Sequence, residues 1–308
     1  MIMKYQSTEK KLKINNFDIS EHINIRNFRH KSANINSLDL PGLSTIELNV
    51  TELCNRTCSF CPRHDPEVYA NQKLFMSLDT VSNLVDQLKK TDWYGDIHIT
   101  GFGEPHTHPK LKEIITLLRK ANVYIEVTSN GDRLIDTHID YAIEMFKAGL
   151  DKLTIDCYDG QKQYLKREEI MKNTFDPLHY NWRLRAHFDD GNAEQLMQEY
   201  GFNNRAGSMG GEGVQNQCFL PFYKTFIDWN GDMTLCCNDW HREAGTMGNI
   251  VKDGLIECWN SKKMKYIRSQ LYQGIRKGVC AKCNIKGTKF GASSVDVHVN
   301  KDLLRINS

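Results

Sequence analysis

The apolar positions along residues 45–188 follow two alternating periods. Five stretches alternate apolar with polar residues or are rich in β-branched residues, which predicts β-strands. They are 45–50, 96–100, 123–128, 151–156 and 182–188. Between them lie helical segments, three amphipathic and the fourth mainly charged, over 77–90, 109–121, 139–149 and 161–173. Strands that alternate with helices predict parallel βαβ units. Five or six such units predict an α/β fold, a partial (β/α)6 TIM-like barrel.

Two of these helices have recognisable ends. Ser77 is a suitable N-cap for the first helix, and Gly149 is a suitable C-cap for the third. The residues expected to be buried by the first helix are Val81, Leu84, Val85 and Leu88. Those expected to be buried by the third are Ile139, Ala142, Ile143 and Phe146. A shorter helix is expected just before the GFNNRAG segment at 201–207.

Three cysteines follow the first predicted strand directly. Cys54, Cys58 and Cys61 form a CxxxCxxC pattern within TELCNRTCSFCP, so three thiols share one short loop at the end of a strand. A 4Fe-4S cluster normally takes four cysteine ligands, and three ligands would therefore leave one iron open. A structural zinc site uses paired CxxC knuckles and a closed tetrahedral shell, which a lone triple matches poorly.

Composition limits the classes of protein that need to be considered. The chain has 308 residues, of which 40% are apolar, and its 40 basic residues nearly balance 38 acidic ones. This balance gives no sign of a general nucleic-acid binder. No run of about 18 apolar residues occurs, and the first residues lack the apolar core of a signal peptide, so we expect a cytoplasmic protein without a membrane partner. In that compartment, clustered cysteines more often bind metal than form disulfides.

The cysteine loop resembles that of the radical S-adenosylmethionine (SAM) enzymes. The resemblance implies that Cys54, Cys58 and Cys61 hold three irons of a 4Fe-4S cluster and that the fourth iron chelates the amino and carboxylate groups of SAM. Phe60 occupies the position of the aromatic residue that lies by the adenine. The reduced cluster would then donate one electron to SAM, which splits into methionine and a 5'-deoxyadenosyl radical that removes hydrogen from a substrate carbon.

The GFGEP segment at 101–105 resembles the family's GGEP motif. Gly103 and Glu104 are retained, whereas Phe102 replaces the first glycine. A carboxylate at Glu104 would accept hydrogen bonds from the SAM ammonium, and Gly103 would let the backbone approach it closely. His106 and His108, just after this motif, are interpreted as surface histidines beside a proline turn.

Two other strand ends resemble the family's SAM pocket. Ser129 and Asn130 would lie near the ribose and the methionine carboxylate, and Thr154 and Asp156 match the Ser-x-Asp at the next strand end. A polar turn after a strand is also commonplace without any ligand. Cys157 is interpreted as a buried small residue and not as a ligand.

The last third of the chain carries a second cysteine set. Asn230-Gly231 between two alternating runs predicts a hairpin. Around and after this hairpin stand four cysteines, which resemble the shortened SPASM, or twitch, domain that holds one auxiliary 4Fe-4S cluster: Cys218, Cys236, Cys280 and Cys283. The spacing also fits a zinc site, and Cys237 or Cys258 is available to replace one of the four ligands.

These patterns divide the chain into four predicted parts. Residues 1–40 are an irregular lead-in, 41–210 the barrel, 211–290 the auxiliary-cluster domain and 291–308 a tail. From Cys258 to Val295 there are nine basic residues and no acidic one. This basic stretch is either a solvated helix face, with Met264, Ile267 and Leu271 turned inward, or a docking surface for an acidic electron donor of the flavodoxin or ferredoxin type.

Three functions stay open at this point. The first is a dehydrogenase that oxidises an alcohol of a small molecule such as a sugar or aminocyclitol, with the auxiliary cluster taking the second electron. The second is a peptide or protein modifier that forms crosslinks or epimerises residues. The third is an iron-sulfur sensor without catalysis, against which the retained Glu104 argues. Arg205, expected at the last strand end, is the candidate for substrate contact or proton transfer.

Overall fold

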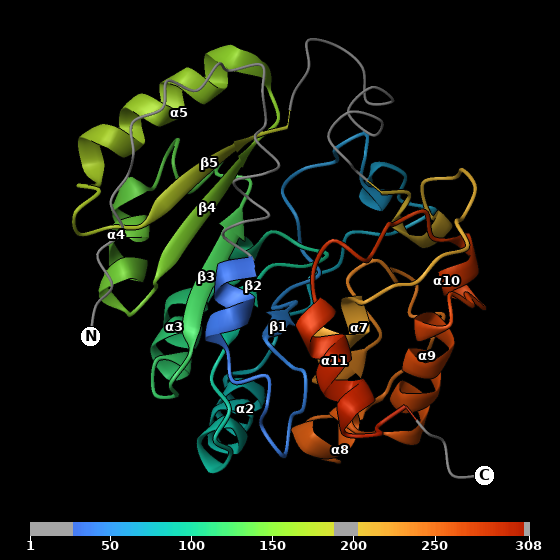
Figure 1. The fold of residues 1–308 in the computed structure, drawn as a ribbon. Coiled ribbons are helices and arrows are strands. Elements are labelled where there is room, and N and C mark those ends of the chain that lie inside the picture. Colours follow the sequence, from blue (N-terminus) through green and yellow to red (C-terminus); the bar gives the residue numbers. More distant parts are fainter. Residues whose placement is uncertain (1–26, 188–202, 305–308) are drawn as a thin grey trace.

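A computed structural model of the chain describes residues 27–187 and 203–304. Its largest element is one eight-stranded sheet in the order β5-β4-β3-β2-β1-β6-β7-β8 (Figure 1). The strands are β1 (Thr45–Leu48), β2 (Asp96–Ile99), β3 (Tyr124–Ser129), β4 (Lys152–Cys157), β5 (Trp182–Ala186), β6 (Lys224–Ile227), β7 (Asp232–Thr234) and β8 (Gly248–Asn249). All five predicted barrel strands are therefore present.

The first five strands are parallel and are joined by helices, as the alternating periods predicted. Each of β2 to β5 pairs in parallel with the strand before it. The helices between them are α2 (Leu78–Lys90), α3 (Leu111–Leu118), α4 (Ile139–Lys147) and α5 (Gly160–Thr174). The predicted α/β class with parallel βαβ units is confirmed.

The two faces of this sheet differ in chemistry because side chains alternate along a strand. Ile46, Ile97 and Ile125 belong to the apolar core that also contains the buried residues of α2 and α3. Their neighbours in sequence, Glu47, His98 and Glu126, point to the opposite face and are also buried. We call the parallel strands β1 to β5 the half-barrel. One face of this half-barrel, the polar interior, carries buried polar side chains, whereas its outer face packs against helices.

Helix boundaries follow the local signals. The Ser77 hydroxyl accepts a hydrogen bond from Thr80 N (3.0 Å) at the start of α2, and the four residues predicted for its apolar face are buried. Gly149 follows α4 with φ of +110°, which few other residues adopt. The predicted face of α4 was partly wrong: the helix buries Ala142 and Met145. Partly buried instead are Ile139, Ile143 and Phe146.

The carboxy-terminal third extends the same sheet. β6 and β7 form the predicted hairpin, with Gly231 at φ of +85° in its turn, and β6 pairs in parallel with β1. The α-helices of this part, as far as Leu304, lie on the right of Figure 1: α7 (Leu220–Tyr223), α8 (Leu255–Trp259), α9 (Lys262–Tyr272), α10 (Val279–Lys282) and α11 (Ala292–Asn300). α9 turns Met264 and Leu271 inward, with Ile267 partly buried.

Some segments differ from the expected irregular ends. Residues 27–32 of the expected lead-in are helical, and α11, within the expected tail, buries Val295 and Val297. The shorter helix predicted before 201–207 and the end of the fifth predicted strand, Phe188, lie outside the described residues. No helix in the described parts of the chain is long and apolar enough to cross a membrane. The four-part division of the chain stays a prediction.

Candidate functional site

The CxxxCxxC loop leaves the sheet directly after β1. Cys54, Cys58 and Cys61 are half-buried, and the loop is compact, with Cys61 N donating to Cys58 O (3.0 Å). Burial raises the pKa of Cys54 to about 11 and that of Cys58 to about 12, and the neighbouring thiols of the loop add to both shifts. The three thiols therefore lie close enough to affect one another. Without a metal they would be protonated at neutral pH.

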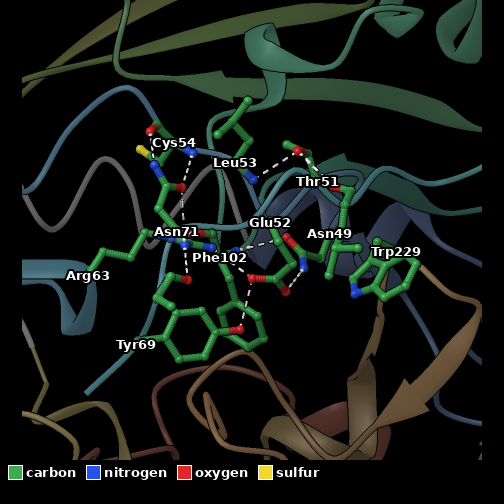
Figure 2. Close-up of polar contacts among 12 residues, drawn as sticks. Asn49, Thr51, Glu52, Leu53, Cys54, Arg63, Tyr69, Asn71, Phe102 and Trp229 are labelled. Carbon is green, nitrogen blue, oxygen red and sulfur yellow. Dashed lines mark hydrogen bonds and ion pairs between the residues drawn. The ribbon is translucent and has the colours of Figure 1, made fainter. Parts of the chain in front are cut away.

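Side chains from outside the loop fix its position. Asn71 holds the backbone of Cys54 from both sides, accepting from its N–H (2.9 Å) and donating to its carbonyl (2.8 Å), as Figure 2 shows. Arg56 donates to Asp132 (2.5 and 3.0 Å), which follows β3. Asn130 donates to Asn55 Oδ1 (2.8 Å). The loop is thus tied to the carboxyl end of β3.

A buried charge network joins this loop to the C-terminal hairpin. The Glu52 carboxylate accepts from Arg63 (2.7 Å), Asn49 (2.9 Å) and the Tyr69 hydroxyl (2.9 Å), and it is 3% exposed (Figure 2). Arg242 donates to the same carboxylate and to Asp228, at the end of β6 (2.8 and 2.7 Å). Two arginines and two carboxylates therefore neutralise one another between the two cysteine sets.

Contacts with Arg63 and with two aromatic rings explain why Phe102 can replace the first glycine of the GGEP motif. Its Nε donates to the Phe102 carbonyl (2.6 Å), while the Phe102 ring packs against Phe226 (4.7 Å between ring centroids) and Trp240 (4.5 Å). Gly103 is required for a different reason than expected. A Cβ there would lie 2.3 Å from the Thr51 carbonyl oxygen, so the glycine permits contact with the chain itself.

Glu104 is a buried carboxylate that forms no ion pair with a cation in the described parts of the chain. Its oxygens accept from the backbone N–H groups of Asn130 (2.7 Å) and His106 (3.1 Å), and it is 5% exposed. Burial raises the pKa of Glu104 to about 7, although these two hydrogen bonds lower it. A buried carboxylate is costly unless a cation pairs with it. The site therefore fits a ligand ammonium, such as that of SAM.

The other predicted SAM residues differ in their contacts. Ser129 accepts from Gly131 N (3.0 Å) at the end of β3, close to Glu104. Thr154 instead donates to Glu126 (2.7 Å), in the polar interior. Asp156 binds Arg185 (2.5 and 2.7 Å) and His187 (3.1 Å). Ser129 and Asn130 thus lie with Glu104, whereas Thr154 and Asp156 already have protein partners. Their assignment to SAM stays a prediction.

The aromatic residue and the histidines near the loop are more buried than a surface interpretation suggests. Phe60 is 8% exposed and packs against Tyr158 (5.1 Å between centroids). The interpretation of His108 as a surface residue was wrong, because it is 4% exposed and its Nε2 lies 3.0 Å from the Met76 carbonyl. His106 is partly buried, and burial lowers its pKa to about 4. The prediction that Cys157 is buried is confirmed.

The second cysteine set lines one cavity. This cavity of about 380 Å³, part of it open to solvent, is lined by all four predicted residues, Cys218, Cys236, Cys280 and Cys283. The thiols affect one another: burial raises the pKa of Cys280 to about 12, and Cys218 and Cys283 add to that shift. Among the described residues, no three His, Cys, Asp or Glu side chains are arranged to hold a single metal ion. The assignment of these four as cluster ligands stays a prediction that the shared cavity supports.

The two remaining cysteines point elsewhere. Cys237 contacts Glu47 in the polar interior, and Cys258 is 1% exposed in the apolar core under Gly248. Neither lines the four-cysteine cavity. Sequence spacing could not show that Cys236 lines the cavity and that these two cysteines do not, because this difference depends on where each side chain points in the folded chain.

Arg205 lies in a 3-10 turn, η3 (Arg205–Gly207), and the segment before it, 188–202, in which the last strand end was expected, lies outside the described residues. Its backbone has φ of +48°, and the next residue, Ala206, lines the four-cysteine cavity. The Arg205 guanidinium lowers the pKa of Cys61 and Cys237, whose values burial raises. Its Nε is buried and has no partner among the described residues. Arg205 is thus near both cysteine sets, and its role stays a prediction.

The Glu52 network yields a stability prediction. Glu52→Ala leaves Arg63 buried without its carboxylate, so we expect the free energy of unfolding to fall by about 3–5 kcal/mol. Urea denaturation of the anaerobic protein measures it. The control is Glu243→Ala, whose exposed pair with Lys282 should change stability by less than about 1 kcal/mol. Equal losses in the two variants would contradict a stabilising role for the network.

Comparison with known proteins agrees with this geometry. A model of the radical SAM superfamily matches residues 48–181, and a model of the SPASM iron-sulfur cluster-binding domain matches residues 218–284. The S-adenosyl-L-methionine-dependent 2-deoxy-scyllo-inosamine dehydrogenase of Niallia circulans is 23% identical over 252 residues, 78% of this chain and 92% of that protein. A probable GTP 3',8-cyclase of Thermococcus kodakarensis is 25% identical over 125 residues, 41% of this chain and 38% of that protein.

Solved structures share the fold. The structure of BtrN in complex with AdoMet and 2-DOIA matches with a TM-score of 0.64 at 21% identity, covering 81% of this chain and 96% of that one. An open conformation of BtrN matches with a TM-score of 0.55 at 20% identity, covering 79% and 92%. The predicted barrel fold is confirmed. The chain contains a radical SAM domain over residues 48–181 and a SPASM iron-sulfur cluster-binding domain over residues 218–284, and these domains imply SAM, a SAM-binding 4Fe-4S cluster and an auxiliary iron-sulfur cluster as cofactors.

Proposed function

We propose that the protein is a radical SAM dehydrogenase that oxidises an alcohol of a small polar molecule, such as an aminocyclitol or a sugar. The observation that carries this proposal is the four-cysteine cavity. Four thiolates complete the ligand shell of a 4Fe-4S cluster, so its use in catalysis is electron exchange and not substrate binding. An alcohol that loses a hydrogen atom must still lose one electron and one proton to become a carbonyl, and this cluster is a suitable acceptor for the electron.

Two further observations support the proposal. The 2-deoxy-scyllo-inosamine dehydrogenase, an aminocyclitol enzyme by its name, resembles this chain over most of both lengths. The half-barrel interior is lined by buried polar residues from consecutive strands, among them Glu47, His98 and Glu126. Such an interior suits hydroxyl and amino groups better than an apolar substrate.

The chain's own residues would act by binding and positioning. Bound at the first site, SAM and the reduced cluster supply a 5'-deoxyadenosyl radical, which removes one hydrogen atom from the substrate carbon. Glu104 would hold the SAM ammonium, and Phe60 would lie against the adenine. Arg205, which affects Cys61 of the first set and directly precedes Ala206 in the lining of the four-cysteine cavity, would bind the substrate hydroxyl. These contacts would place the carbon and exclude water, which are the protein's contributions to such chemistry.

The cysteine variants test the function. In anaerobic protein supplied with SAM, a strong reductant and a panel of aminocyclitols, sugars and peptides, we expect 5'-deoxyadenosine together with a ketone product from a small polyol. Cys280→Ala with Cys283→Ala should retain slow deoxyadenosine formation but lose the ketone, and iron should fall from about eight to about four atoms per chain, because one cluster is lost.

Cys258→Ala is the matched control, because this thiol lies in the core and outside the cavity. It should keep both the iron and the product. Full ketone formation by the double variant would show that the second cluster is only structural. Crosslinked peptide in place of ketone would support the peptide-modifying function instead.

Glu104 gives a pH-dependent prediction. Its raised pKa means that the carboxylate gains a proton as the pH falls through about 7, so SAM affinity should decrease below that pH. Glu104→Gln should weaken SAM binding on the order of tenfold to a hundredfold, because a hydrogen bond to a charged group contributes roughly 1.5–3 kcal/mol. The variant should also lose the pH dependence. Anaerobic SAM titrations of the reconstituted protein measure both effects.

The control for this titration is Glu144→Gln, a change of the same kind at an exposed carboxylate paired with Lys112. Its affinity for SAM should equal that of the unaltered protein. Unchanged SAM affinity in Glu104→Gln would contradict the placement of the ammonium at this carboxylate.

We also propose that an acidic electron donor of the flavodoxin or ferredoxin type docks on the basic stretch that includes α9. Two of its nine cations, Arg268 and Arg276, are buried and do not belong to this surface. Exposed members include Lys262 and Lys263. Surface charge of one sign steers an oppositely charged partner and makes its association sensitive to salt.

Charge reversal tests this docking surface. Lys262→Glu with Lys263→Glu should slow reduction by flavodoxin and flatten the salt dependence of the rate, because long-range attraction is lost. Stopped-flow absorbance measures this rate. The same reversal at two exposed lysines of α2, Lys89→Glu with Lys90→Glu, should leave the rate unchanged. Equal rates in all three proteins would leave only a solvated surface.

A further inference from the structure

Arg276 is a buried cation at the edge of the four-cysteine cavity. It lies between α9 and α10, is 4% exposed, and is one of the residues that line the cavity. Its neighbour in sequence, Lys277, is exposed. The chain therefore turns one of two adjacent cations inward, toward the cysteines, and leaves the other in solvent.

Every acceptor of the Arg276 guanidinium is a neutral oxygen. Nε donates to Asn216 O (2.9 Å), NH1 to Cys283 O (3.2 Å), and NH2 to Ile285 O (2.8 Å). NH2 also donates to Gln217 O (3.3 Å) and to the side-chain oxygen of Asn216. No carboxylate among the described residues forms an ion pair with it.

Two other buried arginines of the chain are paired with carboxylates. Arg63 pairs with Glu52, and Arg167 pairs with Asp132 and Asp136. A buried charge without a partner of opposite sign costs several kcal/mol. The fourth buried arginine among the described residues, Arg268, also donates only to neutral oxygens, but it lies over the Trp259 ring (3.8 Å). Arg276 instead lines the four-cysteine cavity, where an anion would be its charge partner. Four thiolates around an iron-sulfur core carry a net negative charge, and the cavity that Arg276 lines holds four cysteines.

The hydrogen bonds of Arg276 also connect both parts of the ligand set. Asn216 and Gln217 directly precede Cys218, whereas the other acceptors are Cys283 itself and Ile285. The guanidinium is therefore fixed by hydrogen bonds to the backbone of both segments that carry the predicted ligands.

We propose that Arg276 is the charge partner of the auxiliary cluster and raises its reduction potential. Reduction adds one negative charge to the cluster, and a fixed buried cation stabilises the reduced state more than the oxidised state. The cluster is thereby a better acceptor for an electron from the substrate. The inference rests on the proposed cluster ligands and electron-accepting role, and it assigns one residue that makes this role favourable.

A redox titration tests this inference in the full-length chain carrying Cys54→Ala, Cys58→Ala and Cys61→Ala, so that only the auxiliary cluster gives a signal. Arg276→Gln removes the charge and Arg276→Lys retains it. We expect the glutamine variant to shift the reduction equilibrium at least tenfold toward the oxidised state, about 59 mV for one electron. The lysine variant should shift less. Lys277→Gln, the adjacent exposed cation, should not shift.

Iron content decides the remaining outcomes. Loss of iron in Arg276→Gln but not in Arg276→Lys would support the charge requirement, whereas loss in both variants would show that the hydrogen bonds alone matter and would overturn the proposal. Equal potentials in iron-loaded Arg276→Gln and unaltered protein would overturn it too. These measurements use no substrate, so failure here leaves the dehydrogenase proposal standing. Absence of iron before any change at Arg276 would overturn both the cluster ligands and this inference.

Discussion

The pairing of β1 with β6 is the constraint on which the rest of the structure depends. Leu48 lies opposite Ile227 in this parallel pair, and the next residues continue the contact, with Asn49 N donating to Ile227 O (2.9 Å). Carboxyl ends of parallel strands meet at one edge of a sheet. The CxxxCxxC loop after β1 and the hairpin after β6 therefore begin at the same edge, although 179 residues separate Asn49 from Asp228.

Buried charges around the two cysteine sets are mostly paired with charges of opposite sign, and the two exceptions are informative. Where two carboxylates and two arginines lie together, as around Glu52 and Arg242, each charge has a partner of opposite sign and the arrangement is complete without a ligand. Glu104 and Arg276 are exceptions of opposite sign. Among the described residues, the first is a carboxylate held by two backbone N–H groups and the Ser129 side chain, and the second is a cation whose acceptors are all neutral oxygens. Each lies beside a different cysteine set, which is where a cationic and an anionic ligand, respectively, are expected.

The sequence predicted what local pattern determines. The parallel strands, α2 with its Ser77 cap and the Asn230-Gly231 hairpin depend on residues close in the chain, and all are present. The GFGEP motif also identified Glu104 as a candidate residue, but the sequence did not show that this carboxylate is buried without an ion pair among the described residues. Arg242 and Arg276 could not be found in this way, because their significance depends on contacts across the fold: Arg242 lies 190 residues from Glu52. The buried face of α4 was misjudged for the same reason, since the sheet fixes the rotation of a helix.

Phe102 shows how a departure from a family motif can be explained physically. In place of the first glycine of GGEP, this residue uses its carbonyl to bind Arg63, which follows the first cysteine set, and its ring to pack on Phe226 of β6 and on Trp240, which follows Cys236 and Cys237. Glycine would keep the carbonyl and lose the ring contacts. Glu104, the residue of the motif expected to contact SAM, is two positions away and accepts hydrogen bonds from other groups, the backbone N–H groups of His106 and Asn130. The substitution therefore adds a contact between the two cysteine-bearing parts while leaving the candidate SAM contact in place.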